Sequence, residues 1–73
     1  MDEITMIPVT SSNIEAIGHI PERLLLRVTF KSGQTWEYAG VTADVFNQML
    51  NAESVGKFFS ASIRGHYEGK PVQ

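Results

Sequence analysis

The spacing of the apolar residues changes at Gly40, and this change constrains the fold more than any other feature of the sequence. Before Gly40, apolar residues recur at the two-residue period of strands, and after it they recur at the three- and four-residue spacing of helices. Strands that all precede the helices indicate an α+β domain, in which helices cover one face of an antiparallel sheet. A chain of 73 residues holds one such domain, which we assign to residues 1–73 with a core over residues 4–67.

The first half of the chain predicts three antiparallel strands joined by tight turns. The pattern is clearest over residues 24–30, where one face takes Leu24, Leu26, Val28 and Phe30. Residues 13–20 alternate in the same way, which places on one face Ile14, Ala16, Gly18 and Ile20. Turns at 21–23 and 31–34 then connect these strands to a third strand over residues 35–39.

The two ends of the chain have weaker patterns. Residues 4–9 can add a fourth strand, at an edge of the sheet, because Pro8 has no N–H to donate. Residues 68–73 include Gly69 and Pro71, and we expect them to form a loose tail. The expected sheet is therefore a small twisted meander of three to four strands.

Two helices are expected after Gly40, both packed on one face of the sheet. Thr42 is placed to cap the first, which should end near Asn51. Ser54 is placed to cap the second, which should end at Gly65. The apolar stripes of the two helices consist of Val45, Phe46, Met49 and Leu50, and of Val55, Phe58, Phe59 and Ile63. The other face of the sheet is then open to water, a ligand or another copy of the chain.

Composition limits the classes of function. The chain has no cysteine and two histidines, His19 and His66, so we expect no disulfide, no metal site and no cofactor. The run Ser11-Ser12-Asn13 is typical of a turn rather than of a catalytic nucleophile, and we expect that the protein is not an enzyme. The N-terminus is acidic and no apolar run reaches the ~18 residues of a membrane helix, so a cytoplasmic protein without membrane contact is expected.

The charged residues are distributed unevenly. The formal net charge is −2, without the basic excess of a protein that binds phosphate backbones by charge alone. Residues 1–52 carry three basic and six acidic side chains, whereas residues 53–73 carry three basic and two acidic ones. An anion site is therefore expected in the last third of the chain.

A series of short motifs resembles the KTSC domain, which is named for its occurrence at the C-terminus of some lysyl-tRNA synthetases. The motifs are, in order, Ser11-Ser12-Asn13-Ile14, Ala16-Ile17-Gly18, Phe30-Lys31-Ser32-Gly33, Trp36-Glu37-Tyr38, Gly40-Val41, Ser54-Val55-Gly56-Lys57-Phe58-Phe59 and Ile63-Arg64-Gly65-His66-Tyr67. The resemblance spans residues 6–67 and implies a stand-alone module of bacterial or phage origin with a role in RNA binding. The Tyr-x-Tyr motif of the family appears here as Trp36-Glu37-Tyr38, which keeps a flat ring but loses the first phenolic hydroxyl.

The first candidate site is the pair Trp36 and Tyr38. The two residues lie two apart on an expected strand, so both rings emerge from the same face of the sheet. On an open face they could stack on bases. The structural alternative is that both rings pack under the helices or fill an interface between copies of the chain. The register of the second hairpin decides between these alternatives, and the sequence leaves it open.

The second candidate site is an anion site formed by Ser54, Gly56, Lys57 and Arg64 at the start and end of the second helix. The alternative is a plain helix cap followed by solvated charges. The third candidate groups Arg64 with His66 and Tyr67, which could contact phosphate and stack on a base. Its alternative has Arg64 paired with an acidic neighbour, either Glu53 or Glu68, and Tyr67 packed at the edge of the core.

Together these observations favour a non-catalytic binding module of the KTSC type that binds RNA or another phosphate-bearing ligand. The candidate residues are Trp36, Tyr38, Ser54, Lys57, Arg64, His66 and Tyr67. The alternative is a protein-interaction or self-association domain that uses the uncovered sheet face or an edge strand over residues 4–9. The salt concentration distinguishes these two functions. The affinity for a phosphate-bearing ligand falls as salt rises, whereas the affinity of an apolar interface does not.

Overall fold

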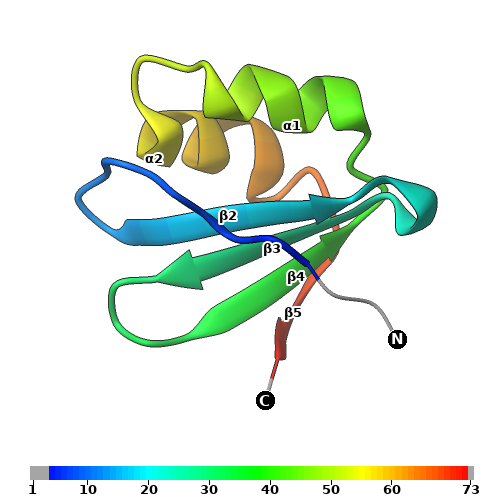
Figure 1. Cartoon of the computed structure of the whole chain (residues 1–73), viewed down its shortest axis with the longest axis horizontal. Helices are drawn as coiled ribbons and strands as arrows, with labels where there is room; N and C mark the ends of the chain where they lie inside the picture. Colours follow the sequence, from blue (N-terminus) through cyan, green and yellow to red (C-terminus); the bar gives the residue numbers. More distant parts are fainter. Residues whose placement is uncertain (1–3, 73) are drawn as a thin grey trace.

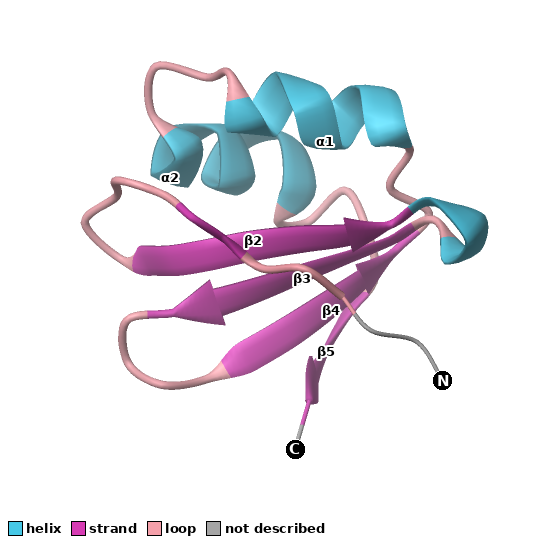
Figure 2. Cartoon of the chain, viewed as in Figure 1, coloured by secondary structure: helices cyan, strands magenta, loops and turns pink. Residues whose placement is uncertain are grey.

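The computed structural model describes residues 4–72, so the acidic residues 1–3 and residue 73 lie outside the described range. The elements, in chain order, are β1 (Ile7–Pro8), β2 (Ile14–Ile20), the 3-10 turn η1 (Pro21–Arg23), β3 (Leu25–Phe30), β4 (Thr35–Ala39), α1 (Ala43–Leu50), α2 (Val55–Phe58), the π-helical turn η2 (Phe59–Ile63) and β5 (Gly69–Val72). The strands form one antiparallel sheet in the order β1-β2-β3-β4-β5, and the helices form a layer on one face of it (Figures 1 and 2). The expected α+β class is confirmed.

The expected caps of both helices are confirmed. The Thr42 hydroxyl accepts a hydrogen bond from the backbone N–H of Val45 at 3.3 Å, and α1 ends at Leu50 with Asn51 as its C-terminal cap. The Ser54 hydroxyl accepts from the backbone N–H of Lys57 at 3.2 Å and begins α2. None of the helices within residues 4–72 is long and apolar enough to span a membrane.

The second helix differs from the expected regular α-helix. Its α-helical part is four residues long and continues as the π-helical turn η2. The N–H of Arg64 closes this wider turn by donating to the carbonyl of Phe59 at 2.8 Å. The helical segment then ends as expected, because Gly65 takes a φ of +83° that reverses the chain.

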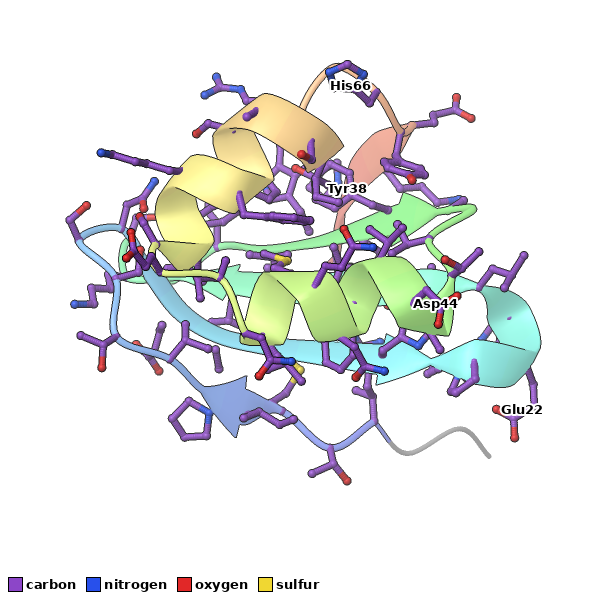
Figure 3. The ribbon with its side chains drawn as sticks, turned by 90° about the horizontal axis from the view of Figure 1, so that it is seen from above. Glu22, Tyr38, Asp44 and His66 are labelled. Carbon is purple, nitrogen blue, oxygen red and sulfur yellow. The ribbon has the colours of Figure 1, made fainter. Side chains whose placement is uncertain are left out.

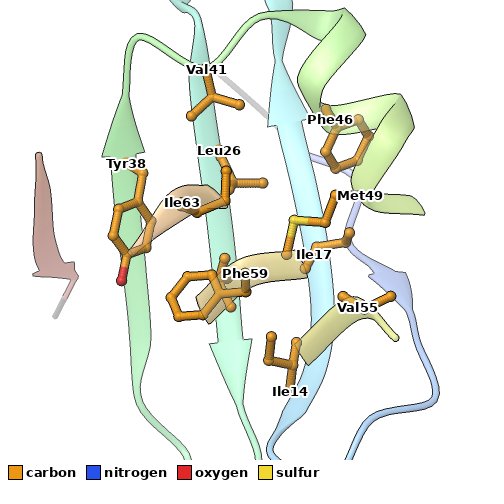
Figure 4. Close-up of a cluster of buried hydrophobic side chains, with 11 residues drawn as sticks. Ile14, Ile17, Leu26, Tyr38, Val41, Phe46, Met49, Val55, Phe59 and Ile63 are labelled. Atoms are coloured by element: carbon orange, nitrogen blue, oxygen red, sulfur yellow. The ribbon is translucent and has the colours of Figure 1, made fainter. Parts of the chain in front are cut away.

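The core lies between the sheet and the helical layer (Figure 4). The sheet contributes Ile17 and Leu26 and the helices contribute Met49 and Ile63, all fully buried. Other buried members of the cluster are Ile14, Val28, Tyr38, Val41, Phe46, Val55 and Phe59. The apolar stripes expected for the two helices therefore face the sheet, with Phe58 partly buried beside them.

A β-bulge changes the pattern of β2. Ile14 pairs with Phe30 and Ala16 pairs with Thr29, so β2 takes two residue steps where β3 takes one. From Ile17 onward the faces are therefore exchanged, and Ile17 is buried in the core opposite Val28. The expected single face of Ile14, Ala16, Gly18 and Ile20 is wrong after the bulge.

Gly18 lies against the N-terminal segment rather than against the helices. A Cβ at this position would lie 2.8 Å from the sulfur of Met6 and 2.8 Å from the carbonyl oxygen of Thr5. Of the expected strand over residues 4–9, only Ile7–Pro8 pairs with β2, and it lies at the edge of the sheet as Pro8 predicts.

The expected loose tail is wrong, because Gly69–Val72 forms strand β5 on the free edge of β4. In this register Tyr38 lies opposite Gly69 and Trp36 lies opposite Pro71. The reason is local packing: the ring of Tyr38 lies directly on the backbone of Gly69, where a Cβ would overlap it. Pairing with β5 also satisfies backbone groups of β4 that would otherwise face water.

The uncovered face of the sheet is polar along its centre. Arg27 on β3 donates from Nε to Glu37 Oε2 on β4 at 2.9 Å, and the two form an ion pair. Lys70 on β5 is in register with Glu37 on its other side. The hydroxyls of Thr29 and Thr35 lie 3.3 Å apart on the same face.

Candidate functional site

A groove with a volume of about 850 Å³ opens where η2 and the following segment meet β4 and the β3–β4 turn. Its aromatic lining consists of Phe30, Trp36, Tyr38, Phe59 and Tyr67. Its polar lining includes Ser12, Asn13, Lys31, Gln34, Ser60 and Arg64. The volume lies in the range of sites that bind small organic molecules.

Both rings of the Trp36 and Tyr38 pair lie on the helix-covered face of the sheet. Their ring centroids are 6.4 Å apart and their planes differ by 22°. Tyr38 is 7% exposed and packs against the edge of Phe59, at a centroid distance of 5.4 Å. Trp36 is only partly buried, so Tyr38 belongs to the core and Trp36 leaves part of its ring at the groove. Of the two alternatives that the sequence leaves open, the structure therefore shows the covered face.

Arg64 lines the groove close to Tyr38. The π-helical turn places Arg64 directly after its last residue, Ile63, where the backbone becomes extended. Burial raises the pKa of the Tyr38 phenol above its ordinary value, and the positive charge of Arg64 lowers it in part. Within residues 4–72, no ion pair joins Arg64 to either Glu53 or Glu68, so its charge faces the groove and solvent.

The last candidate cluster is only partly assembled. The chain reverses at Gly65 and brings Tyr67 back to the groove, where its backbone N–H donates to the carbonyl of Ile63 at 3.1 Å. His66 lies at the outside of this reversal, exposed and away from the groove lining (Figure 3). The structure therefore brings Arg64 and Tyr67 to one groove and leaves His66 outside it.

The candidate residues of α2 line a second, shallower hollow of about 710 Å³. Its lining consists of Ser12, Asn13, Ser54, Gly56, Lys57, Ser60 and Ala61. The hydroxyl of Ser54 already serves as the cap of α2, as expected if this segment is a plain helix cap. Lys57 lines this hollow and Arg64 lines the groove, so the two cations do not converge on one point.

The turn at Ser11-Ser12-Asn13 joins the two hollows. The Ser11 hydroxyl accepts from the backbone N–H groups of Asn13 and Ile14, each at 3.4 Å, so the expected turn is confirmed. A Cβ at Gly56 would lie 2.9 Å from the Ser11 hydroxyl, so this turn packs directly against α2. The described part of the chain has no cluster of three His, Asp or Glu side chains that could hold a metal ion.

Several residues of the groove were missed by reasoning from the sequence. They include Ser12, Asn13, Phe30, Lys31, Gln34 and Ser60. Most are polar residues of turns, whose side chains have no periodic pattern that would mark a site. Most of them fall within the motifs Ser11-Ser12-Asn13-Ile14 and Phe30-Lys31-Ser32-Gly33. Their place in these motifs is the one feature of the sequence that could have indicated a site there.

Comparisons with known proteins bear on the family and the fold of the chain. The sequence model of the KTSC domain matches residues 10–67. A protein from Tsukamurella paurometabola is 39% identical over 62 residues, covering 85% of this chain and 92% of the relative. An uncharacterized protein from Stutzerimonas stutzeri is 33% identical over 62 residues, covering 84% and 87%. The crystal structure of a KTSC domain protein from Yersinia pestis superimposes with a TM-score of 0.91 at 30% identity, covering 97% of this chain and all of the other.

Proposed function

Since the chain belongs to the KTSC domain family, we propose that it is a non-catalytic binding module whose groove binds RNA or another phosphate-bearing ligand. One observation carries the proposal: the partly exposed ring of Trp36 and the charge of Arg64 line the same groove. A flat aromatic surface beside a cation is the combination that holds an unpaired base and its phosphate.

Trp36 supplies the surface for stacking. Stacking of a base on an aromatic side chain contributes about 1–3 kcal/mol and tolerates any base sequence. Tyr38 packs parallel to the indole and is itself held by Phe59, so the indole rests on a rigid support. The substitution of the first tyrosine of the family motif by Trp36 keeps this role, because the role needs a flat ring and no hydroxyl.

Arg64 and Lys31 supply the positive charge. Both line the groove, and within the described residues neither is bound to a carboxylate. The planar guanidinium of an arginine can donate two parallel hydrogen bonds to a phosphate. Because the whole chain carries a net charge of −2, long-range attraction adds little. Binding should therefore be local, modest in affinity and sensitive to salt.

The surface of the sheet makes the alternative function, self-association or protein binding, less favourable than RNA binding. Self-association or protein binding would use the uncovered face or an edge strand. The uncovered face carries the ion pair between Arg27 and Glu37 along its centre, which is a poor surface for apolar contact. Both edge strands are short and contain a proline, Pro8 in β1 and Pro71 in β5, which disfavours the addition of another strand.

The proposal is tested by titrating a single-stranded oligouridylate into the protein and following the fluorescence of Trp36 at low and at moderate salt. We expect quenching at low salt, with an affinity that falls steeply as salt rises. Arg64→Ala should weaken binding about tenfold without unfolding the domain, because it removes a charge-assisted contact.

Lys70→Ala is the matched control, because it removes one positive charge from a residue outside the groove lining. A folded Arg64→Ala variant with unchanged affinity would remove Arg64 from the site. A protein that ignores RNA and scatters light as a salt-resistant dimer would favour the self-association alternative.

A further inference from the structure

The groove and the second hollow lie side by side on the molecule. Ser12, Asn13 and Ser60 line both of them, so the two hollows meet at these three small polar residues. We propose, building on the function above, that the ligand is a single strand of at least two nucleotides that occupies both hollows. One base stacks on Trp36, and the adjacent phosphate lies at Lys57.

The two hollows differ in chemistry in the way such a ligand requires. The groove has aromatic rings and the guanidinium of Arg64, which suit one base and its phosphate. The second hollow is lined by hydroxyl, amide and small side chains and by one cation, Lys57, with no aromatic ring. This composition suits a sugar–phosphate backbone better than a second stacked base.

Lys57 is the group in the second hollow that is free to attract a phosphate. Its side chain is exposed, and within the described residues it forms no ion pair. The hydroxyl of Ser54 is already bound to the backbone N–H of Lys57, so it contributes little to a ligand. The Lys57 side chain therefore carries the second contact.

The arrangement favours a single strand over a duplex. Stacking on Trp36 requires a base whose face is free, and the bases of a duplex already stack on each other. In addition, Trp36 lies on the helix-covered face, where only part of its ring remains exposed at the groove. An unpaired base can enter such a recess, whereas a duplex would meet only its rim.

The test compares ligands of increasing length, using the fluorescence of Trp36, the single tryptophan of the chain. The probes are uridine 5′-monophosphate and the 5′-phosphorylated di- and trinucleotides of uridine, at low salt. We expect the trinucleotide to bind about fivefold more tightly than the monophosphate, because it adds a phosphate contact at Lys57. Lys57→Gln should abolish this gain.

Lys70→Gln is the matched control, because it removes the same charge from β5, outside both hollows, and should keep the gain. For trinucleotide binding, the slope of the logarithm of the affinity against the logarithm of the salt concentration should also be smaller by about one in Lys57→Gln, but not in Lys70→Gln. Equal affinities for the monophosphate and the trinucleotide, or a gain that survives Lys57→Gln, would overturn the inference and leave the groove as a one-nucleotide site. Absence of quenching by every probe in folded protein would overturn the proposed function as well.

Discussion

Phe59 connects the core to the groove. Its side chain is 4% exposed and lies in the buried cluster, yet it also lines the groove. Phe30 and Tyr38 pack against it at centroid distances of 5.5 and 5.4 Å, both close to perpendicular. Such edge-to-face contacts add to the free energy gained by burying the rings. The walls of the groove therefore depend on one residue of the core.

We predict that Phe59→Ala destabilises the domain by about 3–5 kcal/mol, the usual loss when a buried phenylalanine is truncated. That loss is comparable to the whole free energy of unfolding of a small domain, so the variant should be largely unfolded at room temperature. Thermal and urea unfolding, followed by circular dichroism, measure the change. Phe58→Ala is the control, because its partly buried ring should cost clearly less. Equal losses in the two variants would contradict the prediction.

Signals that depend on near neighbours in the chain could be predicted from the sequence. The caps at Thr42 and Ser54 involve a hydroxyl and an N–H three residues later, so the local sequence is sufficient. The positive φ of Gly65 is likewise a property of one residue at a helix end. The face taken by Trp36 was left open, because it depends on how one strand aligns with another.

At the scale of elements, β5 shows how tertiary packing can create a strand. The segment Gly69–Val72 contains a glycine and a proline, both of which are poor strand formers, and so the sequence predicts a tail. The strand forms because the ring of Tyr38 covers the backbone of Gly69, which has no side chain to obstruct it. The bulge in β2 was equally invisible, since it depends on the pairing with β3.

Gly69→Ala should therefore loosen β5. A methyl group at this position overlaps the ring of Tyr38, which must shift or release the strand. We expect a loss of about 1–3 kcal/mol, as is usual for overpacking, together with a weaker near-ultraviolet signal from the aromatic cluster. Denaturant unfolding measures the loss, and Lys70→Ala, on the uncovered face beside Gly69, serves as the control. If both variants unfold at the same denaturant concentration, the ring does not hold the strand.

At the scale of the whole molecule, the groove is assembled from segments that are distant in the sequence. The turn before β2, the end of β3, strand β4, the turn η2 and the segment before β5 all contribute to it. Trp36 and Tyr38 could be singled out from the sequence, because an aromatic pair on a strand is visible there. Apart from Arg64, its polar members could not, because the fold alone brings Asn13 and Ser60 to the same place.

The burial of Tyr38 makes the stability of the whole domain sensitive to alkaline pH. The pKa of its phenol is raised above 10.0 by burial, more than Arg64 lowers it, so the folded state keeps this proton when the unfolded state loses it. The free energy of unfolding should then fall as the pH rises above about 10, and this contribution is fully present below that pH. Urea unfolding between about pH 9 and pH 11 measures the slope.

Tyr38→Phe isolates this effect, since lysines titrate in the same pH range. The variant should be less sensitive to alkaline pH than the unmodified protein. Arg64→Gln should raise the pKa of Tyr38 further, because the opposing positive charge is removed. An identical pH dependence with and without the Tyr38 hydroxyl would show that its proton does not contribute.

The bulge in β2 also bears on how related sequences should be aligned. Between Ile14 and Ala16, β2 advances by two residues while β3 advances by one. One residue of β2, Glu15, therefore has no partner in β3. A relative that lacks Glu15 would therefore keep Ile14 and Ile17 on the core side with an unbroken ladder. Deletion of Gly18, which lies beyond the bulge, would instead turn His19 away from the helices. Alignments of related chains should thus place single-residue gaps at Glu15, where the fold tolerates them.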